Sequence, residues 1–237
     1  SLETFELPNE HSYIGLDNYK TAITQYDFIK AVGWTVVITV LSVVAILLFC
    51  SMTAWYITRV KNIATKIIYL LCVFSMVIPF QMVMFTLAGT ADALHLNTPW
   101  GIVIVYLGFG TGLAVFMFCG FIKSIPLEVE EAAMIDGCTP LKTFFRVVIP
   151  IMKPTYISVG ILEAMWIWND FLLPNLIINK TGWQTLPLKT YLFFGQFTKR
   201  WDLATAGLIL CMIPIIIFYI SCQRYIVKGV TDGAVKG

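Results

Sequence analysis

The sequence predicts an all-α integral membrane protein, with residues 1–237 forming a single transmembrane domain. Hydrophobic residues make up 58% of the chain, and its mean hydropathy is +0.81. Charged residues make up 13%, against roughly 25% in ordinary soluble domains. Five apolar segments reach the length of about 20 residues that a helix needs to cross a bilayer. None of them alternates in the manner of a membrane β-strand.

The five predicted spans lie near residues 31–57, 67–89, 100–122, 154–178 and 203–222. Lys and Arg accumulate in cytoplasmic loops, and ten of the sixteen lie after span one, three or five. Those regions, including the tail at residues 223–237, are therefore predicted to be cytoplasmic. Residues 1–30 and the loop at residues 179–202 are then external. An external N-terminus without a signal-peptide pattern predicts a sixth span upstream of residue 1.

Two features predict the local geometry of the second and third spans. Pro79 lies in the middle of the second span and predicts a kink, because proline removes a helical hydrogen bond. Gly108 and Gly112 form a GxxxG pattern in the third span, which predicts close packing against another helix.

The longest polar connection, residues 124–150, joins the third and fourth spans. Ser124 is a suitable N-cap for a helix with Pro126 and several acids in its first turn. Gly137 stands where a left-handed residue ends a helix. Thr139 then caps a second helix that begins at Pro140. We therefore predict a helix–turn–helix, which suits a cytoplasmic docking element better than an active site.

The motif in this connection closely resembles the EAA loop of ABC-importer permeases. Glu131, Ala132 and Ala133 are followed after three residues by Gly137, and after nine more by Val-Val-Ile-Pro at residues 147–150. The family pattern ends Ile-x-Leu-Pro, so the replacements are conservative. Residues 78–81, residues 168–171 and the tail at residues 223–237 are similar to segments of the carbohydrate-uptake subfamily. The resemblance runs from about Leu16 to Gly237.

This resemblance implies the type I ABC importer permease fold, in a bacterial or archaeal cytoplasmic membrane. It implies a heterodimer with a second homologous permease, two ATPase subunits that bind ATP and Mg, and an extracytoplasmic sugar-binding protein. It implies alternating access driven by the ATPases, with no catalytic residue and no bound cofactor in this chain. The EAA helix would seat in a groove of the ATPase. The residues implied to couple to it are Glu130, Glu131, Ala132, Ala133, Asp136 and Gly137.

The residue types in the EAA loop suit that role independently of the family. Ala132 and Ala133 allow a partner surface to approach closely, and Glu131 offers a charge-assisted hydrogen bond. No GxxxxGK[ST] phosphate-binding loop occurs in the chain. The sequence therefore assigns ATP chemistry to a partner.

Polar side chains at membrane depth occur in the fourth span, where charge is costly and usually functional. They are Glu163, Trp166, Asn169 and Asp170. Helical periodicity places three of them on one stripe, with Asn169 at its edge. Two interpretations remain open: a wall of the sugar pathway, or a face that packs against other helices with its acids hydrogen-bonded internally.

The loop at residues 179–202 is interpreted from its position in relatives, where the equivalent loop reaches into the binding protein. Its predicted tip consists of Lys180, Thr181, Gly182 and Trp183. The alternative is an interfacial belt of aromatic side chains, which suits residues 191–197.

Other function classes are disfavoured by composition. A net charge of +2 without a Lys/Arg run does not indicate nucleic-acid binding. His11 and His95 are isolated, and the six cysteines are scattered, so no metal site is predicted. An ion-coupled secondary transporter using Glu163 and Asp170 is the main alternative, although it leaves the EAA loop unexplained. A membrane enzyme would need a cluster of catalytic side chains that the sequence does not show.

Overall fold

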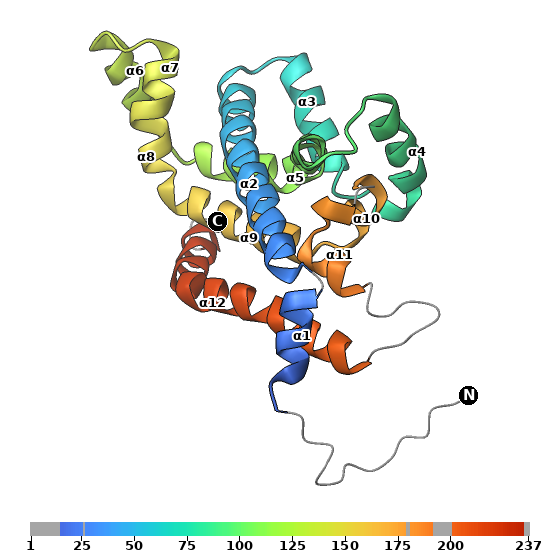
Figure 1. Cartoon of the computed structure of the whole chain (residues 1–237). Helices are drawn as coiled ribbons and strands as arrows, with labels where there is room; N and C mark the ends of the chain where they lie inside the picture. Colours follow the sequence, from blue (N-terminus) through green and yellow to red (C-terminus); the bar gives the residue numbers. More distant parts are fainter. Residues whose placement is uncertain (1–14, 26, 179–180, 192–200, 235–237) are drawn as a thin grey trace.

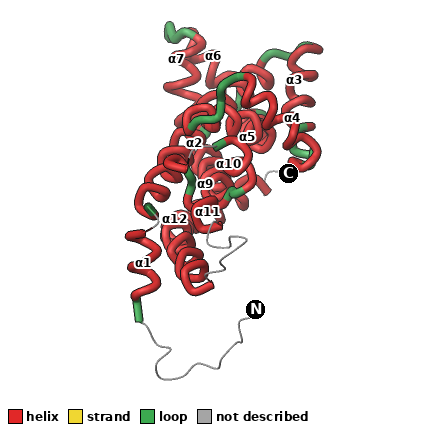
Figure 2. Tube along the Cα trace, turned by 45° about the vertical axis from the view of Figure 1, so that its right-hand side comes forward, coloured by secondary structure: helices red, strands yellow, loops and turns green. Residues whose placement is uncertain are grey.

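The computed structural model describes residues 15–25, 27–178, 181–191 and 201–234, and this part of the chain is helices and loops without a strand (Figure 2). The α-helices in chain order are α1 Asp17–Gln25, α2 Phe28–Arg59, α3 Ile63–Phe74, α4 Phe80–Ala93, α5 Pro99–Ile122, α6 Leu127–Ile135, α7 Pro140–Thr143, α8 Ile149–Ile151, α9 Lys153–Asn169, α10 Leu172–Ile177, α11 Leu186–Tyr191 and α12 Trp201–Ala234. A π-helix, Phe144–Val148, joins α7 to α8, and a 3-10 turn, Thr181–Trp183, precedes α11.

Three helices in the described residues are long and apolar enough to cross a membrane unbroken. They are α2, α5 and the Asp202–Gln223 part of α12, which overlap the first, third and fifth predicted spans. The backbone of α12 remains helical to Ala234, so the predicted tail begins as a continuation of this helix.

The second predicted span is interrupted. Helix α3 ends at Phe74, and α4 begins at Phe80 after the cap residue Pro79, whose ψ of 132° is extended. The expectation of a single kinked helix was therefore wrong. Proline cannot donate to the preceding turn and disfavours helical geometry in the residue before it. The break occupies residues 75–79.

Helix α5 lies at the centre of the bundle and packs against α2 and α9 on one side and against α3 on the other. A Cβ added to Gly110 would lie 2.5 Å from the Ile46 Cδ1 atom. A Cβ added to Gly112 would lie 2.9 Å from the carbonyl oxygen of Cys72, at the end of α3. Gly108 has open space around it. The predicted close packing thus occurs, but Gly110 takes the place of Gly108.

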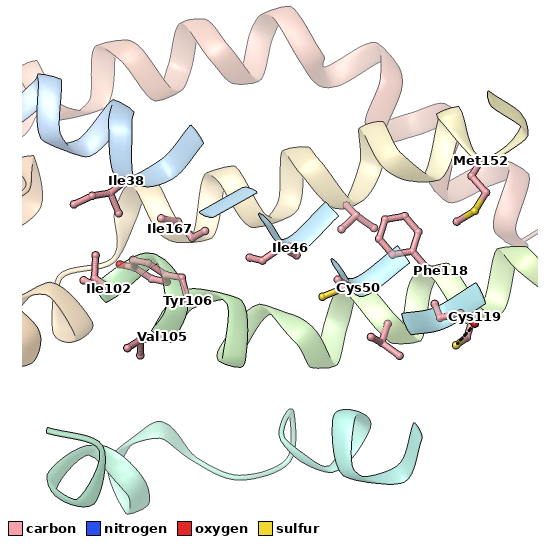
Figure 3. Packing of buried hydrophobic residues seen from close by; sticks show 14 of the residues in the cluster. Ile38, Ile46, Cys50, Ile102, Val105, Tyr106, Phe118, Cys119, Met152 and Ile167 are labelled. Carbon is pink, nitrogen blue, oxygen red and sulfur yellow. Dashed lines mark hydrogen bonds between the residues drawn. The ribbon is translucent and has the colours of Figure 1, made fainter. Parts of the chain in front are cut away.

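The main core lies between α2, α5 and α9, and Figure 3 shows its apolar side chains meeting from these three helices. Ile46, Tyr106 and Phe118 are among its fully buried members. The outer surfaces of α3 and α12 carry exposed isoleucine, leucine and methionine side chains. This distribution suits a protein whose periphery meets lipid or other membrane helices.

The fourth predicted span is also interrupted. Helix α9 ends at Asn169, and Asp170 leaves the helix with a ψ of 126°. The Asp170 Oδ1 atom accepts hydrogen bonds from the backbone N–H groups of Leu172 (3.0 Å) and Leu173 (3.4 Å) at the start of α10. The prediction of one helix over residues 154–178 was therefore wrong, because Asp170 leaves the helical geometry and its carboxylate accepts from the first amides of a new helix.

Candidate functional site

The EAA loop lies at one end of the molecule, the same end at which α2 ends and α3 begins (Figure 1). Helix α6 begins at Leu127 after Pro126, and Ser124 does not cap it. Instead, the Ser124 hydroxyl donates to the carbonyl oxygen of Phe121 (2.8 Å) in the last turn of α5. The expected cap was wrong because Ser124 lies too early to reach the first amides of α6.

The turn after α6 has the predicted geometry. Gly137 has a φ of +88°, and the N–H of Cys138 donates to the carbonyl oxygen of Ala133 (3.0 Å). This is the hydrogen bond that closes a helix whose next residue is left-handed. The Thr139 hydroxyl oxygen then accepts from the N–H of Lys142 (3.4 Å), with Pro140 in the first turn of α7. The predicted helix–turn–helix is present.

A buried ion pair ties α6 to the end of α2. Glu130 is 1% exposed, and its Oε1 atom accepts from the Arg59 Nε (2.9 Å) and Nη2 (2.6 Å) atoms. Its Oε2 atom accepts from Trp55 Nε1 (2.9 Å). The Arg59 Nη2 atom also donates to the carbonyl oxygen of Ile125 (3.0 Å). We refer to Arg59, Glu130 and Trp55 as the bracket. Both carboxylate oxygens are satisfied, which is the condition for a buried charge to be tolerated.

The bracket separates Glu130 from the other residues predicted to couple to the ATPase. Glu131, Ala132, Asp136 and Gly137 are exposed, and Ala133 is half-buried. Apolar side chains accompany them on the free surface, where Ile135 is 86% exposed and Leu141 is 57% exposed. Glu130 faces the bundle and positions α6. Its helical spacing could not reveal this role, since Arg59 and Trp55 are more than 70 residues away.

A second connection joins the EAA element to the membrane bundle. The Pro140–Ile151 segment meets α9 at an angle of 78°. Phe144 and Val148 on this segment and Met152 at the bend are fully buried, and the Phe144 ring lies 5.3 Å from that of Trp55. The EAA element is therefore held by α2 on one side and continues into α9 on the other.

Three of the four polar residues of the fourth span, Glu163, Trp166 and Asp170, lie against α5 as the predicted stripe requires, whereas Asn169 lies elsewhere. Glu163 is 2% exposed, its Oε1 atom has no hydrogen-bond partner among the described residues, and it faces α5 at Gly110. Asp170 accepts a hydrogen bond from the hydroxyl of Tyr106 (3.0 Å). Trp166 is partly exposed with its ring 5.5 Å from that of Tyr106. Asn169 is exposed and lines a groove of about 300 Å³ against α11 and α12.

The described part of the loop at residues 179–202 is anchored to the bundle. The carbonyl oxygen of Gly182 accepts from Trp34 Nε1 (3.0 Å), and Trp183 packs against the main core. Thr181 opens the 3-10 turn, and Lys180 lies outside the described residues. The assignment of this segment as a binding-protein contact stays a prediction.

The fold, with its broken and unbroken helices and the helix–turn–helix, can now be compared with known proteins. The chain belongs to the family described as binding-protein-dependent transport system inner membrane component, which it matches over residues 46–232. It is therefore a membrane-embedded permease subunit of a binding-protein-dependent ABC importer, and the predicted resemblance is confirmed.

Individual relatives agree with this assignment. The chain is 44% identical over 233 residues to a probable starch degradation products transport system permease protein of Thermoanaerobacterium thermosulfurigenes, covering 98% of this chain and 84% of the relative. It is 37% identical over 237 residues to a multiple sugar-binding transport system permease protein of Streptococcus mutans, with coverages of 98% and 84%.

Solved structures share the fold. A chain of a bacterial ABC transporter that imports the acidic polysaccharide alginate superposes with a TM-score of 0.72 at 23% identity, covering 94% of this chain and 82% of that one. A chain of the MetNI methionine ABC transporter superposes with a TM-score of 0.63 at 14% identity, with coverages of 85% and 95%. These likenesses establish the type I importer fold.

Proposed function

We propose that this permease serves an ATP-driven importer of oligosaccharides. The names of its relatives support a carbohydrate substrate, since they refer to starch degradation products, multiple sugars and arabinooligosaccharides. The proposed assembly contains a second homologous permease, two ATPase subunits that bind ATP and Mg, and an extracytoplasmic sugar-binding protein. In this assembly the chain lines the translocation pathway and performs no catalysis itself.

The observation that carries the coupling part of this proposal is the bracket, which holds α6 while leaving its apolar surface free. An exposed Ile135 beside small alanines suits insertion into an apolar groove of a partner. Because Arg59 and Trp55 bind Glu130, a displacement of α6 is passed to the end of α2. The same displacement reaches α9 through the π-helix and α8.

The proposed mechanism is a rigid-body motion driven by the ATPases. Helices α2, α5 and α9 share one packed core, so they respond together when the EAA element moves. ATP binding would favour one arrangement of the bundle and hydrolysis would release it, provided that the two arrangements bind ATP differently. Glu163 and Asp170 are enclosed by this core or bonded within it, which gives little support to an ion-coupled transporter that uses them.

Reconstitution of the complete importer in liposomes tests the proposal. We expect oligosaccharide uptake that requires ATP and the binding protein, and that exceeds uptake of single sugars. Ile135→Asp should reduce recovery of the ATPase subunits with the permease, because it places a charge in an apolar contact. The matched control is Leu16→Asp, since Leu16 is also exposed but precedes α1 on the external side. Uptake by the permease alone without ATP would overturn the proposal.

A further inference from the structure

A basic groove lies beside the bracket, at the end of the bundle that is predicted to be cytoplasmic. It has a volume of about 920 Å³ and lies between the end of α2, the first turns of α3 and the last turn of α5. Four cations line it, Arg59, Lys61, Lys66 and Lys123, and none of its lining residues is acidic. We refer to this cavity as the basic groove.

The charge of the groove is largely uncompensated. Arg59 is neutralised by Glu130 in the bracket. Within the described residues, no carboxylate lies within ion-pairing distance of Lys61, Lys66 or Lys123. All three lysines are exposed. The Lys123 Nζ atom lies 5.8 Å from the centre of the Tyr69 ring, so this ammonium group is directed over a wall of the groove.

The walls of the groove are apolar, which distinguishes it from a site for a small soluble anion. Ile57, Ile63 and Leu70 line it together with the Tyr69 ring. Ile63 is 77% exposed and Leu70 is 63% exposed. Helix α3 continues away from the groove with further exposed apolar side chains, Ile67, Ile68, Leu71 and Phe74. The groove therefore places cations, which can bind an anionic group, next to an exposed apolar helix face, which can bind a hydrocarbon chain.

We propose that the basic groove binds an anionic phospholipid of the cytoplasmic leaflet. The phosphate would lie among Lys61, Lys66 and Lys123, and the acyl chains would follow the exposed apolar face of α3. Basic cavities between membrane helices on the cytoplasmic side are suited to anionic headgroups. An acidic surface of a soluble partner would satisfy the lysines but would leave the apolar face of α3 uncovered. A phospholipid would pair with the lysines through its phosphate and would cover the apolar face of α3 with its acyl chains.

The location of the groove gives the lipid a role in coupling. Arg59 lines the groove and also holds Glu130. A phosphate beside Lys61 and Lys66 would therefore stand close to the joint between α2 and α6. Occupation of the groove would restrict the loop at residues 60–62 and so stiffen that joint. We expect an anionic lipid to raise the amount of transport obtained per ATP hydrolysed.

Native mass spectrometry of the complete importer measures the binding directly. The complex is placed in nanodiscs that contain phosphatidylcholine and phosphatidylglycerol, and the phosphatidylglycerol molecules that remain bound after release are counted. The test variant is Lys66→Gln with Lys123→Gln. The matched control is Lys20→Gln with Lys153→Gln, two exposed lysines outside the groove. We expect the test variant to retain phosphatidylglycerol on the order of tenfold less strongly, and the control to behave as the wild type.

Two further measurements distinguish other occupants. Inorganic phosphate at millimolar concentration should not displace the phospholipid, because it lacks the chains that contact α3. Displacement by phosphate would overturn the lipid proposal in favour of a simple anion site. Loss of the ATPase subunits from the test variant, with retained phosphatidylglycerol, would identify the groove as a protein interface and would also overturn it. Equal lipid retention by the test and control variants would do the same.

Discussion

Two buried glutamates, Glu130 on α6 and Glu163 on α9, differ in the side chains that surround them. Glu130 lies on α6 in the EAA element, where Arg59 and Trp55 satisfy both of its oxygens. Glu163 lies in the bundle, where its Oε1 atom has no partner among the described residues. Both side chains are 1–2% exposed. The comparison shows that burial alone does not reveal a role: partners make Glu130 a positioning residue, whereas the missing Cβ of Gly110 makes room for Glu163.

The largest expected effect is the loss of the bracket. Arg59→Ala leaves the Glu130 carboxylate buried without its cation, and removing one member of a buried ion pair costs about 3–5 kcal/mol. We expect the lower end of this range, because the Arg59 side chain is 18% exposed. The variant should hydrolyse ATP with little oligosaccharide transport. Thermal denaturation and the ratio of transport to ATP hydrolysis in liposomes measure the two effects.

A charge exchange separates the ion pair from the packing of the bracket. Arg59→Glu combined with Glu130→Arg should recover part of the coupling that either single change removes, because the opposite charges meet again. Glu131→Ala is the control for α6, since Glu131 is the exposed neighbour of Glu130. If Glu131→Ala destabilised the protein as much as Arg59→Ala, the bracket would contribute no more to the position of α6 than an exposed residue does.

A second prediction compares two glycines of α5, Gly110, which lies against Glu163, and Gly112, which lies against the end of α3. A Cβ at Gly112 meets the backbone oxygen of Cys72 at 2.9 Å, whereas a Cβ at Gly110 meets the flexible end of Ile46 and the Glu163 Oε2 atom at 3.0 Å. Gly112→Ala should therefore cost about 1–3 kcal/mol of stability through overpacking. Gly110→Ala should cost less, because side-chain ends move more easily than backbone.

The control for both glycine variants is Gly108→Ala, which has open space and should gain slightly from the better helix propensity of alanine. Thermal denaturation of the purified complex measures all three variants under the same conditions. Equal losses for Gly110→Ala and Gly112→Ala would show that Glu163 is held as rigidly as a backbone segment. The contrast between the two glutamates would then be smaller than the hydrogen bonds suggest.

A third prediction concerns the turn that ends α6. Gly137→Val should cost about 1–2 kcal/mol, because a β-branched residue is strained at a φ of +88°. Gly137→Asn should be better tolerated, since asparagine adopts left-handed geometry more readily. We expect the valine variant to lose coupling between ATP hydrolysis and transport while the membrane bundle stays folded. Normal coupling in Gly137→Val would argue against a docking role for this turn.

The sequence predicted those features that depend on nearby residues. The helical class, the three unbroken spans and the Gly137–Thr139–Pro140 turn follow from hydropathy and capping chemistry over short stretches. At Pro79 the sequence predicted a kink and not a full break, and the break at Asp170 was not predicted, because apolar residues continue on both sides of each. The bracket was missed for another reason. Arg59 was used only as one of the positive charges that predict the cytoplasmic side. Nothing in its own segment indicates that Glu130 packs against it.

The smallest expected effect is that of Glu163→Gln, the neutral and nearly isosteric change at the second glutamate. The Glu163 carboxylate has no ion-pair partner among the described residues, so the substitution breaks no salt bridge there. It also removes any cost of placing a charge in the bundle, and we expect stability to change by less than about 1 kcal/mol. Transport per ATP hydrolysed should stay close to that of the wild type. A large loss of transport with intact assembly would instead show that Glu163 meets the substrate in another arrangement of the bundle. In that case Gly110 would provide the space through which the carboxylate reaches the pathway, and the two glutamates would both be functional for different reasons.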